Sequence, residues 1–457
     1  MSKLRFFIAL WLAKLSQPVL KITKHNGTNF PGELALKICP DFLRYIAKPK
    51  RVITVTGTNG KTTVNNLICD ALEMDGTRIL NNRAGSNINS GIATSLINGV
   101  TIFNRERYET AVLEVDERSS KKIYPFVQPD YTVITNLFRD SIMRNAHPEF
   151  IAGILSESFP SKTKLVLNAD DLISVGVAPQ NPRAYYGIER MDTDVTECHN
   201  LIRDIRICPE CSTELKYDYL RYHHIGKAYC PKCGFKSPDY DYAGAEVDVK
   251  NMRIKVKDAR GEGTYRLLSD SVFNIYNVVT LVAVLRELGF EHEEIEKRVE
   301  KLEIVKSRYN EETAGKNRII MQMAKDRNAL ACSRAFDYVQ SREGEKELLL
   351  MMNNLNDERG WSENTCWLYD CDFELLNREN ISHIICTGPR ALDYRLRLLL
   401  AGVPEGKIDC EKDELTATEK LWHKPGTDIY MFYGTDTVPL AMRVKAKIKA
   451  ICEEAAK

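Results

Sequence analysis

A β-branched run followed at once by a glycine turn is the feature that most constrains the fold of this chain. Arg51-Val52-Ile53-Thr54-Val55 has the composition of a buried strand. It leads through Thr56-Gly57-Thr58-Asn59-Gly60-Lys61-Thr62-Thr63 into a helix-like segment. A strand, a glycine turn and a helix N-terminus together present backbone N–H groups and the positive end of a dipole to phosphate. The sequence therefore predicts a nucleotide-binding α/β domain.

Residues of this turn have separate expected roles. Gly57 and Gly60 allow the backbone to approach phosphate oxygens, Lys61 reaches the β- and γ-phosphates, and the Thr62 hydroxyl binds Mg²⁺. Thr58, Asn59 and Thr63 complete the expected nucleotide-binding set. The strict G-x-x-x-x-G-K-[ST] pattern is not met, because Val55 stands at the first glycine position. An ordinary strand-to-helix turn is the alternative.

Short apolar runs and helical stretches alternate along most of the chain, which predicts two α/β domains with mainly parallel sheets. We expect a central domain over 51–312 and a C-terminal α/β domain over 313–457. The strands are expected at 111–115, 131–135, 164–167, 347–351, 366–369, 383–387 and 428–432.

The first fifty residues are expected to form helical segments that pack on the central domain, interrupted at Gly27, Pro31-Gly32 and Pro40. The apolar stretch 6–13 is followed by Lys14 and is too short to span a bilayer. We expect an amphipathic helix lying on the protein, and peripheral contact with a membrane surface is the alternative.

Four of the thirteen cysteines have the spacing of a metal site, C-x₂-C-x₁₈-C-x₂-C: Cys208, Cys211, Cys230 and Cys233. They lie in an insertion at about 205–240, and four thiolates leave Zn²⁺ no open coordination position, so the site is expected to be structural. His223 and His224 are expected at the surface rather than as ligands. The odd cysteine count and the metal spacing favour a reducing, cytoplasmic location.

Polar residues at the ends of predicted elements extend the expected site. Glu114 ends a predicted strand and is expected to bind Mg²⁺, directly or through water; a solvated acidic turn is the alternative. Asn274 and Asn277 open an apolar helix, where they either contact adenine or cap the helix. Arg308, between the two α/β halves, is expected to reach a phosphate or ribose; an ordinary surface arginine is the alternative.

These segments together resemble the Mur ligase superfamily and, within it, the MurT family. The glycine turn and the four-cysteine insertion carry the resemblance, with further MurT-like stretches at 27–32, 82–87, 114–117, 135–140, 167–171, 274–277, 369–374 and 388–393. Nearly the whole chain is covered. The resemblance implies a Mur-ligase-like central P-loop ATPase domain with an inserted Cys₄ zinc ribbon, followed by a C-terminal Rossmann-like α/β domain.

The resemblance also implies a reaction. ATP phosphorylates the α-carboxylate of D-glutamate in the lipid II stem peptide, and ammonia from a GatD-like glutaminase partner then gives D-isoglutamine. It implies catalytic roles for Lys61 and Glu114, Mg²⁺ at Thr62 and Glu114, and nucleotide contacts from Asn274, Asn277 and Arg308. One C-terminal aspartate completes the partner's Cys-His site; Asp370 matches that position best, and Asp372 follows closely.

Three stretches depart from the family pattern, near the acceptor substrate and the domain interface: 141–146, 324–327 and 357–360. A stand-alone Mur-type ligase that adds an amino acid is the second interpretation of the chain. A nucleotide-binding module whose ribbon contacts nucleic acid is the third. A net charge of +1 and the ribbon residues Glu210, Glu214 and Asp218 argue against that module, so we expect no nucleic-acid partner.

Overall fold

The computed structural model describes residues 2–22, 27–83, 85–139, 147–303, 309–324, 328–351, 365–434 and 437–456. Arg308 lies outside this part of the chain, as do the departing stretches 141–146, 325–327 and 357–360. The chain forms two compact units. Unit 1 consists of Met1–Phe138, His147–His199 and Arg203–Ile304, and unit 2 of Arg139–Ala146, Asn200–Ile202 and Val305–Lys457.

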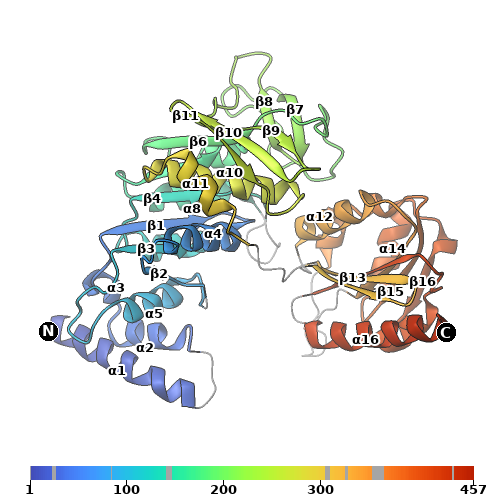
Figure 1. The fold of residues 1–457 in the computed structure, drawn as a ribbon, viewed down its shortest axis with the longest axis horizontal. Helices are drawn as coiled ribbons and strands as arrows, with labels where there is room; N and C mark the ends of the chain where they lie inside the picture. Colours follow the sequence, from blue (N-terminus) through green and yellow to red (C-terminus); the bar gives the residue numbers. More distant parts are fainter. Residues whose placement is uncertain are drawn as a thin grey trace. The chain divides into compact units, whose positions relative to one another are not determined.

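Unit 1 is built on a nine-stranded sheet of order β11-β10-β9-β6-β5-β4-β1-β3-β2 (Figure 1). The pairs from β2 across to β9 are parallel, whereas β10 pairs antiparallel with both β9 and β11. Its strands are β1 (Arg51–Thr56), β2 (Ile79–Asn81), β3 (Thr110–Glu114), β4 (Tyr131–Ile134), β5 (Lys164–Asn168), β6 (Arg183–Ile188), β9 (Tyr242–Asp248), β10 (Arg253–Asp258) and β11 (Gly261–Arg266).

The parallel strands are short apolar runs because helices cover both faces of the sheet. In β1, Val52 faces the cluster that the N-terminal helices share with β3, and Ile53 and Val55 point to the opposite face. The helices of unit 1 are α1 (Ser2–Ile22), α2 (Phe30–Ile38), α3 (Phe42–Tyr45), α4 (Lys61–Glu73), α5 (Asn89–Gly99), α6 (Ser120–Ile123), α8 (Pro148–Ser158), α9 (Leu172–Val175), α10 (Val272–Glu287), α11 (His292–Val299) and the 3₁₀ turn η1 (Glu117–Ser119).

The N-terminal helices pack on this sheet domain. Phe6 and Leu10 of α1 share a core with Ile92 and Leu96 of α5. The expected interruption at Pro31-Gly32 is wrong, because α2 runs through both residues. Pro31 occupies the first turn, where its missing N–H is not needed for a helical hydrogen bond. Within the described part of the chain, no helix combines the length and the apolar character that crossing a bilayer requires.

The cysteine insertion folds as a small two-stranded unit between β6 and β9. Its antiparallel strands are β7 (Lys216–Tyr222) and β8 (Ile225–Tyr229). Its apolar core is a small cluster in which Leu215 and Ala228 of the insertion pack with Leu172 of α9. Because this core is small, the insertion depends on other contacts for its stability.

Unit 2 has its own six-stranded sheet of order β12-β13-β17-β14-β15-β16. Its strands are β12 (Tyr309–Ala314), β13 (Asn317–Met323), β14 (Lys346–Met351), β15 (Ile381–Thr387), β16 (Ile408–Glu411) and β17 (Asp428–Tyr433). All pairs are parallel except β12 with β13. Its helices are α12 (Ala329–Gln340), α14 (Ala391–Leu400), α15 (Glu414–Ala417), α16 (Val438–Ala455) and the 3₁₀ turns η2 (Cys366–Asp370), η3 (Phe373–Leu376), η4 (Glu405–Lys407) and η5 (Thr418–Lys420).

One expected strand of unit 2 is wrong. Residues 366–369 form the 3₁₀ turn η2 instead of a strand. Trp367 and Leu368 are both buried although they are adjacent, which a half-buried strand does not allow. A short apolar run of this kind does not distinguish a strand from a helical turn by its pattern alone.

Candidate functional site

The turn between β1 and α4 has the backbone of a phosphate-binding loop. Gly57 and Gly60 have φ angles of 123° and 84°, which residues with a side chain rarely adopt. A Cβ atom on Gly57 would lie 2.4 Å from Thr135 Oγ1, and one on Gly60 would lie 2.8 Å from Asn277 Oδ1. Both positions therefore require glycine. The turn delivers the chain to the N-terminus of a thirteen-residue helix, whose first N–H groups have no intrahelical partner.

The segment after the neighbouring strand β4 braces this turn. Thr58 N donates to Asn136 O at 2.7 Å, and Asn59 N donates to Asn136 Oδ1 at 3.1 Å. The Thr135 hydroxyl donates to Asn59 O at 2.6 Å, and Phe138 N donates to Thr58 Oγ1 at 2.9 Å. The loop is therefore held in place before any ligand binds, which lowers the ordering cost of binding.

Lys61 is the first residue of α4, and its side chain lies over the turn. Nζ donates to Gly57 O and pairs with Glu117 Oε1 at 2.9 Å. The two side chains are only 16% and 6% exposed. Burial alone would lower the pKa of Lys61, but the Glu117 carboxylate and the nearby Glu114 raise it above its usual value. The ammonium group is therefore held in its charged form, as a phosphate-binding lysine requires.

Glu114 is the last residue of β3 and lies beside the same turn, because its register partner in β1 is Val55. Asn87 Nδ2 donates to Glu114 Oε1 at 2.9 Å, and Asn82 bridges the Glu114 backbone through both its amide atoms. Among the described residues, the Glu114 carboxylate is held by one neutral amide, that of Asn87, while Asn82 fixes the backbone. Thr62 is exposed in the first turn of α4. A carboxylate and a hydroxyl are both hard oxygen donors, which is the kind of ligand that Mg²⁺ prefers.

A small pocket adjoins the glycine turn. It has an aromatic wall and an amide rim, formed by Asn59, Gly60, Thr135, Asn136, Tyr186, Tyr222, Phe273, Tyr276, Asn277 and Thr280. The rings of Tyr222 and Phe273 lie 4.4 Å apart. Aromatic faces beside amide groups match what a planar heterocyclic base requires, which is a stacking surface and a few polar contacts.

The start of α10 places one of its two asparagines in this pocket. Asn277 lines it, and Asn277 Nδ2 donates to Asn274 Oδ1 at 3.0 Å. Asn274 Nδ2 in turn donates to Ser271 Oγ at 3.0 Å. Ser271 is the N-cap residue of α10, so the alternative in which Asn274 caps the helix is wrong. Asn274 instead orients Asn277.

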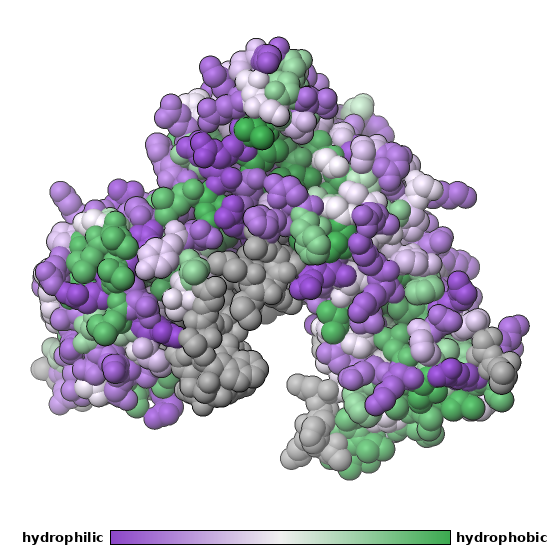
Figure 2. Space-filling model, turned by 180° about the vertical axis from the view of Figure 1, so that it is seen from behind, coloured by the Kyte–Doolittle hydropathy of each residue, from purple (hydrophilic) through white to green (hydrophobic). Residues whose placement is uncertain are grey.

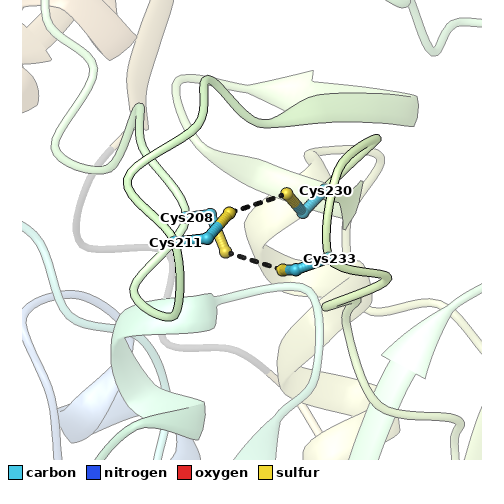
Figure 3. Close-up of side chains that lie close together, drawn as sticks. All are labelled: Cys208, Cys211, Cys230 and Cys233. Carbon is cyan, nitrogen blue, oxygen red and sulfur yellow. Dashed lines mark hydrogen bonds between the residues drawn. The ribbon is translucent and has the colours of Figure 1, made fainter.

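The four cysteines of the insertion come together (Figure 3). All four Sγ atoms lie within 4.8 Å of one another, with 3.6 Å between Cys208 and Cys233 and 3.5 Å between Cys211 and Cys230. Tetrahedral zinc with Zn–S bonds of about 2.3 Å separates its sulfur ligands by about 3.8 Å, so the cluster fits that ion. Among the described residues, this is the one group of three or more His, Cys, Asp or Glu side chains that could hold a metal ion.

We expect the purified protein to carry one zinc ion per chain, and Cys208→Ser to lose most of it. Once the ion is lost, only the small apolar core stabilises the ribbon. The midpoint temperature of thermal unfolding should therefore fall by several degrees. Elemental analysis and thermal unfolding with and without a chelator measure both effects. Cys366→Ser, at an exposed cysteine outside the cluster, is the matched control. Full zinc content in the Cys208 variant would contradict the assignment.

The two histidines between the knuckles are not at the surface, so that expectation is wrong. His223 and His224 are 3% and 1% exposed. His224 Nε2 lies 3.1 Å from Asp171 Oδ1, and its ring is 4.4 Å from that of Phe138. The hairpin turn packs back onto the sheet and buries both rings. Neither histidine belongs to the cysteine cluster in the described part of the chain, and that they do not bind a metal stays a prediction.

A buried ion network fastens the ribbon to the sheet beneath the pocket. Arg221, on β7, lies 3.3 Å from Asp170 Oδ2 and 2.8 Å from Asp194 Oδ2. The side chains of these three residues are almost completely buried. Tyr276, which lines the pocket, donates to Asp170 Oδ2 at 2.7 Å. Residues of the pocket wall and of the zinc ribbon therefore belong to one network of ion pairs and hydrogen bonds. No local pattern in the sequence indicates this network.

Arg221→Leu is expected to lower the free energy of unfolding by about 3–5 kcal/mol, because it leaves two buried carboxylates without a cation. Arg206→Leu is the control in the same insertion. Arg206 is 64% exposed and lies 3.9 Å from Glu214, so its loss should cost less than about 1 kcal/mol. Urea unfolding compares the two variants. Equal losses would show that the Arg221 network does not hold the ribbon.

The two candidate aspartates of unit 2 differ in their surroundings. Asp372 is 3% exposed, and its carboxylate accepts from Leu201 N at 2.7 Å and Asn200 Nδ2 at 3.0 Å. Asp370 ends the 3₁₀ turn η2, with a side chain that is 38% exposed and lies 3.7 Å from Arg139 Nη1. Asp370 is therefore the carboxylate that an incoming side chain can reach.

The structure thus gathers the glycine turn, Lys61, Glu114 and Asn277 around one edge of the unit 1 sheet. Arg308 is not among the described residues. Glu117, the ion-pair partner of Lys61, was not among the site residues expected from the sequence. It belongs to the run of carboxylates that begins with Glu114 at the end of β3.

Comparison with known proteins agrees with this geometry. The family described as Mur ligase middle domain matches residues 55–200, and the MurT ligase C-terminal family matches residues 326–435. A solved pseudomurein peptide ligase type C from Methanothermus fervidus superposes with a TM-score of 0.65 at 21% identity, covering 90% of this chain and 81% of that one. These matches confirm the predicted Mur-ligase-like α/β fold.

Two curated relatives match over most of their length. Subunit MurT of lipid II isoglutaminyl synthase (glutamine-hydrolyzing) from Staphylococcus aureus (strain COL) is 31% identical over 441 residues, 96% of this chain and 97% of the relative. The protein of the same name from Streptococcus pneumoniae (strain ATCC BAA-255 / R6) is 30% identical over 389 residues, 84% of each chain. This chain therefore belongs to the MurT family of the Mur ligase superfamily.

Proposed function

We propose that this chain is the ATP-dependent synthetase subunit of a glutamine amidotransferase, which converts the D-glutamate α-carboxylate of the lipid II stem peptide to D-isoglutamine. The observation that carries the proposal is a charged, buried lysine on a braced glycine turn, in a chain that matches MurT subunits almost end to end. The partner is a GatD-like glutaminase, and the acceptor is a lipid-linked muropeptide.

In the first step, a carboxylate oxygen of the acceptor attacks the γ-phosphorus of ATP. A new O–P bond forms, the bond to ADP breaks, and the acceptor becomes an acyl phosphate. Both reactants are anionic, so catalysis consists mainly of positioning them and offsetting their charge. Lys61 Nζ and the first N–H groups of α4 supply positive charge at the turn, and Glu114 and Thr62 are the proposed ligands of Mg²⁺, which would share in that neutralisation.

Lys61 must change partners for this to happen. Nζ now donates to Gly57 O, inside the turn that phosphate would occupy. A bound phosphate would replace that carbonyl, while the Glu117 ion pair keeps the ammonium charged and aimed at the turn. Glu117 is therefore a positioning residue in this proposal.

In the second step, ammonia attacks the acyl carbon, a C–N bond forms, and phosphate leaves with the C–O bond electrons. Excess protons pass from nitrogen to solvent. The ammonia is proposed to come from the glutaminase, whose imidazole would be oriented by Asp370. The accessible carboxylate of Asp370 supports this role better than the occupied carboxylate of Asp372.

The proposed nucleotide site uses Gly57 to Thr63 for the phosphates, Asn277 for the base and Asn274 to orient Asn277. Arg308 is proposed to contact phosphate or ribose. The proposed domains are an N-terminal helical segment over 1–50, an ATPase domain and a MurT-type domain. The expected boundary between 312 and 313 would divide strand β12 (Tyr309–Ala314) of the unit 2 sheet, so we place this boundary before residue 309. We place the protein in the cytoplasm, where ATP and reduced thiols are available.

The test is to combine the chain with its glutaminase, ATP, glutamine and a purified muropeptide, and to follow the product by mass spectrometry. Conversion of one acid to an amide, dependent on both ATP and glutamine, is the expected result. Addition of a whole amino acid instead, without any glutaminase, would replace the proposal with a stand-alone Mur-type ligase.

A further inference from the structure

Within the described part of the chain, the helix α1 exposes a continuous apolar stripe on the side away from its core contacts. We call it the α1 outer face, and its side chains are 42 to 82% exposed: Leu4, Ile8, Trp11, Leu12, Leu15, Val19 and Ile22. At about 100° per residue, these seven positions fall within one arc of about 100° on the helix. The lower right of Figure 2, where α1 comes to lie after the half-turn from Figure 1, is accordingly a broad hydrophobic surface.

The opposite side of α1 packs against the hydrophobic core of unit 1. Phe6, Ala9, Leu10 and Ala13 are buried, and they join the cluster that includes α5. The core contacts of α1 therefore lie on one side of the helix, and the α1 outer face lies on the other. An exposed stripe of this size on one helix marks an interaction surface rather than scattered apolar residues.

A neighbouring loop extends the α1 outer face. Trp11 Nε1 donates to Ile102 O at 2.9 Å, which ties the helix to residues 101–103. Ile102 and Phe103 are 54% and 68% exposed. Lys14 Nζ donates to Ile97 O and Val100 O, so the helix is anchored to the end of α5 on this side as well. These hydrogen bonds hold the α1 outer face in place on unit 1.

The charge of this region is strongly one-sided. α1 carries Lys3, Arg5, Lys14 and Lys21 and no acidic residue. The first fifty residues hold nine Lys and Arg but only two acidic residues, Glu33 and Asp41, although the whole chain has a net charge of +1. The helix that carries the α1 outer face therefore has a formal charge of +4.

We propose that the α1 outer face docks the protein onto an anionic phospholipid bilayer, with the helix lying in the plane of the interface. Apolar side chains in one arc, a tryptophan among them and cations beside them are the features of a helix that binds such a surface. A second copy of this chain fits less well, because face-to-face pairing of α1 would bring like charges together.

This surface goes beyond the proposed amidation, since it concerns where the protein works and not what it catalyses. It would bring the ATPase domain to an acceptor that a lipid anchor holds at the membrane. The experiment uses lipid vesicles without nucleotide, partner or muropeptide, so its outcome does not depend on the proposed function.

The full chain is mixed with vesicles of phosphatidylcholine, or of phosphatidylcholine with phosphatidylglycerol, and sedimented. We expect binding to the anionic vesicles, weaker binding at high salt, and little binding to neutral vesicles. Leu4→Gln/Leu15→Gln should lower the partition coefficient about tenfold or more. A blue shift of tryptophan emission should accompany binding and be lost in Trp11→Phe.

Leu392→Gln/Leu396→Gln is the matched control, because these leucines are also exposed and one helical turn apart, on α14. It should bind vesicles like the parent chain. All substituted residues are exposed, and circular dichroism checks that the variants fold. Equal partitioning of the α1 variant and its parent would overturn the proposal. Concentration-dependent dimerisation abolished by the α1 variant, without vesicle binding, would assign the surface to a second copy.

Discussion

Lys61→Ala is expected to lower the rate of ATP-dependent amidation by about 10³-fold or more. The variant removes the ammonium group that lies on the glycine turn, in contact with Gly57 O and Glu117. Without it, the transferring phosphoryl group loses its cationic partner, while the fold keeps its braced loop. The measurement is the initial rate of amide formation in the complex with its glutaminase, followed by mass spectrometry.

Lys121→Ala is the matched control for this variant. Lys121 is half exposed on α6 and pairs with Glu157 at the surface, so its removal should leave the rate unchanged. Glu117→Gln adds a second comparison, because it keeps the lysine but removes its carboxylate. We expect a loss of amidation rate smaller than that of Lys61→Ala, since the Glu117 carboxylate then no longer orients the Lys61 ammonium group. Undiminished amidation by Lys61→Ala would remove the turn from the mechanism.

Asp370→Asn is expected to lower glutamine hydrolysis in the reconstituted complex by about 10²- to 10⁴-fold, because an amide cannot stabilise the imidazolium that an aspartate orients. ATP binding should be unchanged, since Asp370 is not among the residues that we propose to contact the nucleotide. Glutaminase activity and nucleotide affinity are measured on the same preparation.

Asp372→Asn separates this role from a structural one. Its carboxylate already accepts hydrogen bonds from Leu201 N and Asn200 Nδ2, and its own N–H donates to Ser333 Oγ. Its substitution should lower thermal stability and leave glutamine hydrolysis much closer to normal. The reverse pattern, with full activity in Asp370→Asn and loss in Asp372→Asn, would assign the role to Asp372.

The local parts of the fold could be predicted because each depends on neighbours in sequence. The strand Arg51–Thr56 is a β-branched run, and the positive φ angles of Gly57 and Gly60 follow from a motif whose glycines are spaced for a tight turn. The cysteine spacing likewise predicted a cluster that the structure forms. The strand and the glycine turn are encoded within a few residues, whereas the two cysteine pairs are joined by the ligand geometry that one metal ion requires.

The contacts that the sequence did not reveal all join distant segments. Arg221 pairs with Asp170, 51 positions earlier in the chain, and the partner of His224 is Asp171. Such pairs depend on how the ribbon folds back onto the sheet, which no local pattern encodes. The turn at Cys366–Asp370 was misassigned for a related reason, since tertiary packing of Trp367 decided its shape.

In the proposed mechanism, the turn from Gly57 to Thr63 holds the phosphates of ATP. A crystal structure with a non-hydrolysable ATP analogue and Mg²⁺ would show whether it does. We expect the γ-phosphate in the turn, with Lys61 Nζ moved from Gly57 O to a phosphate oxygen and the base beside Asn277. Nucleotide density at another place in the chain, with this turn empty and Lys61 still bound to Gly57 O, would contradict it.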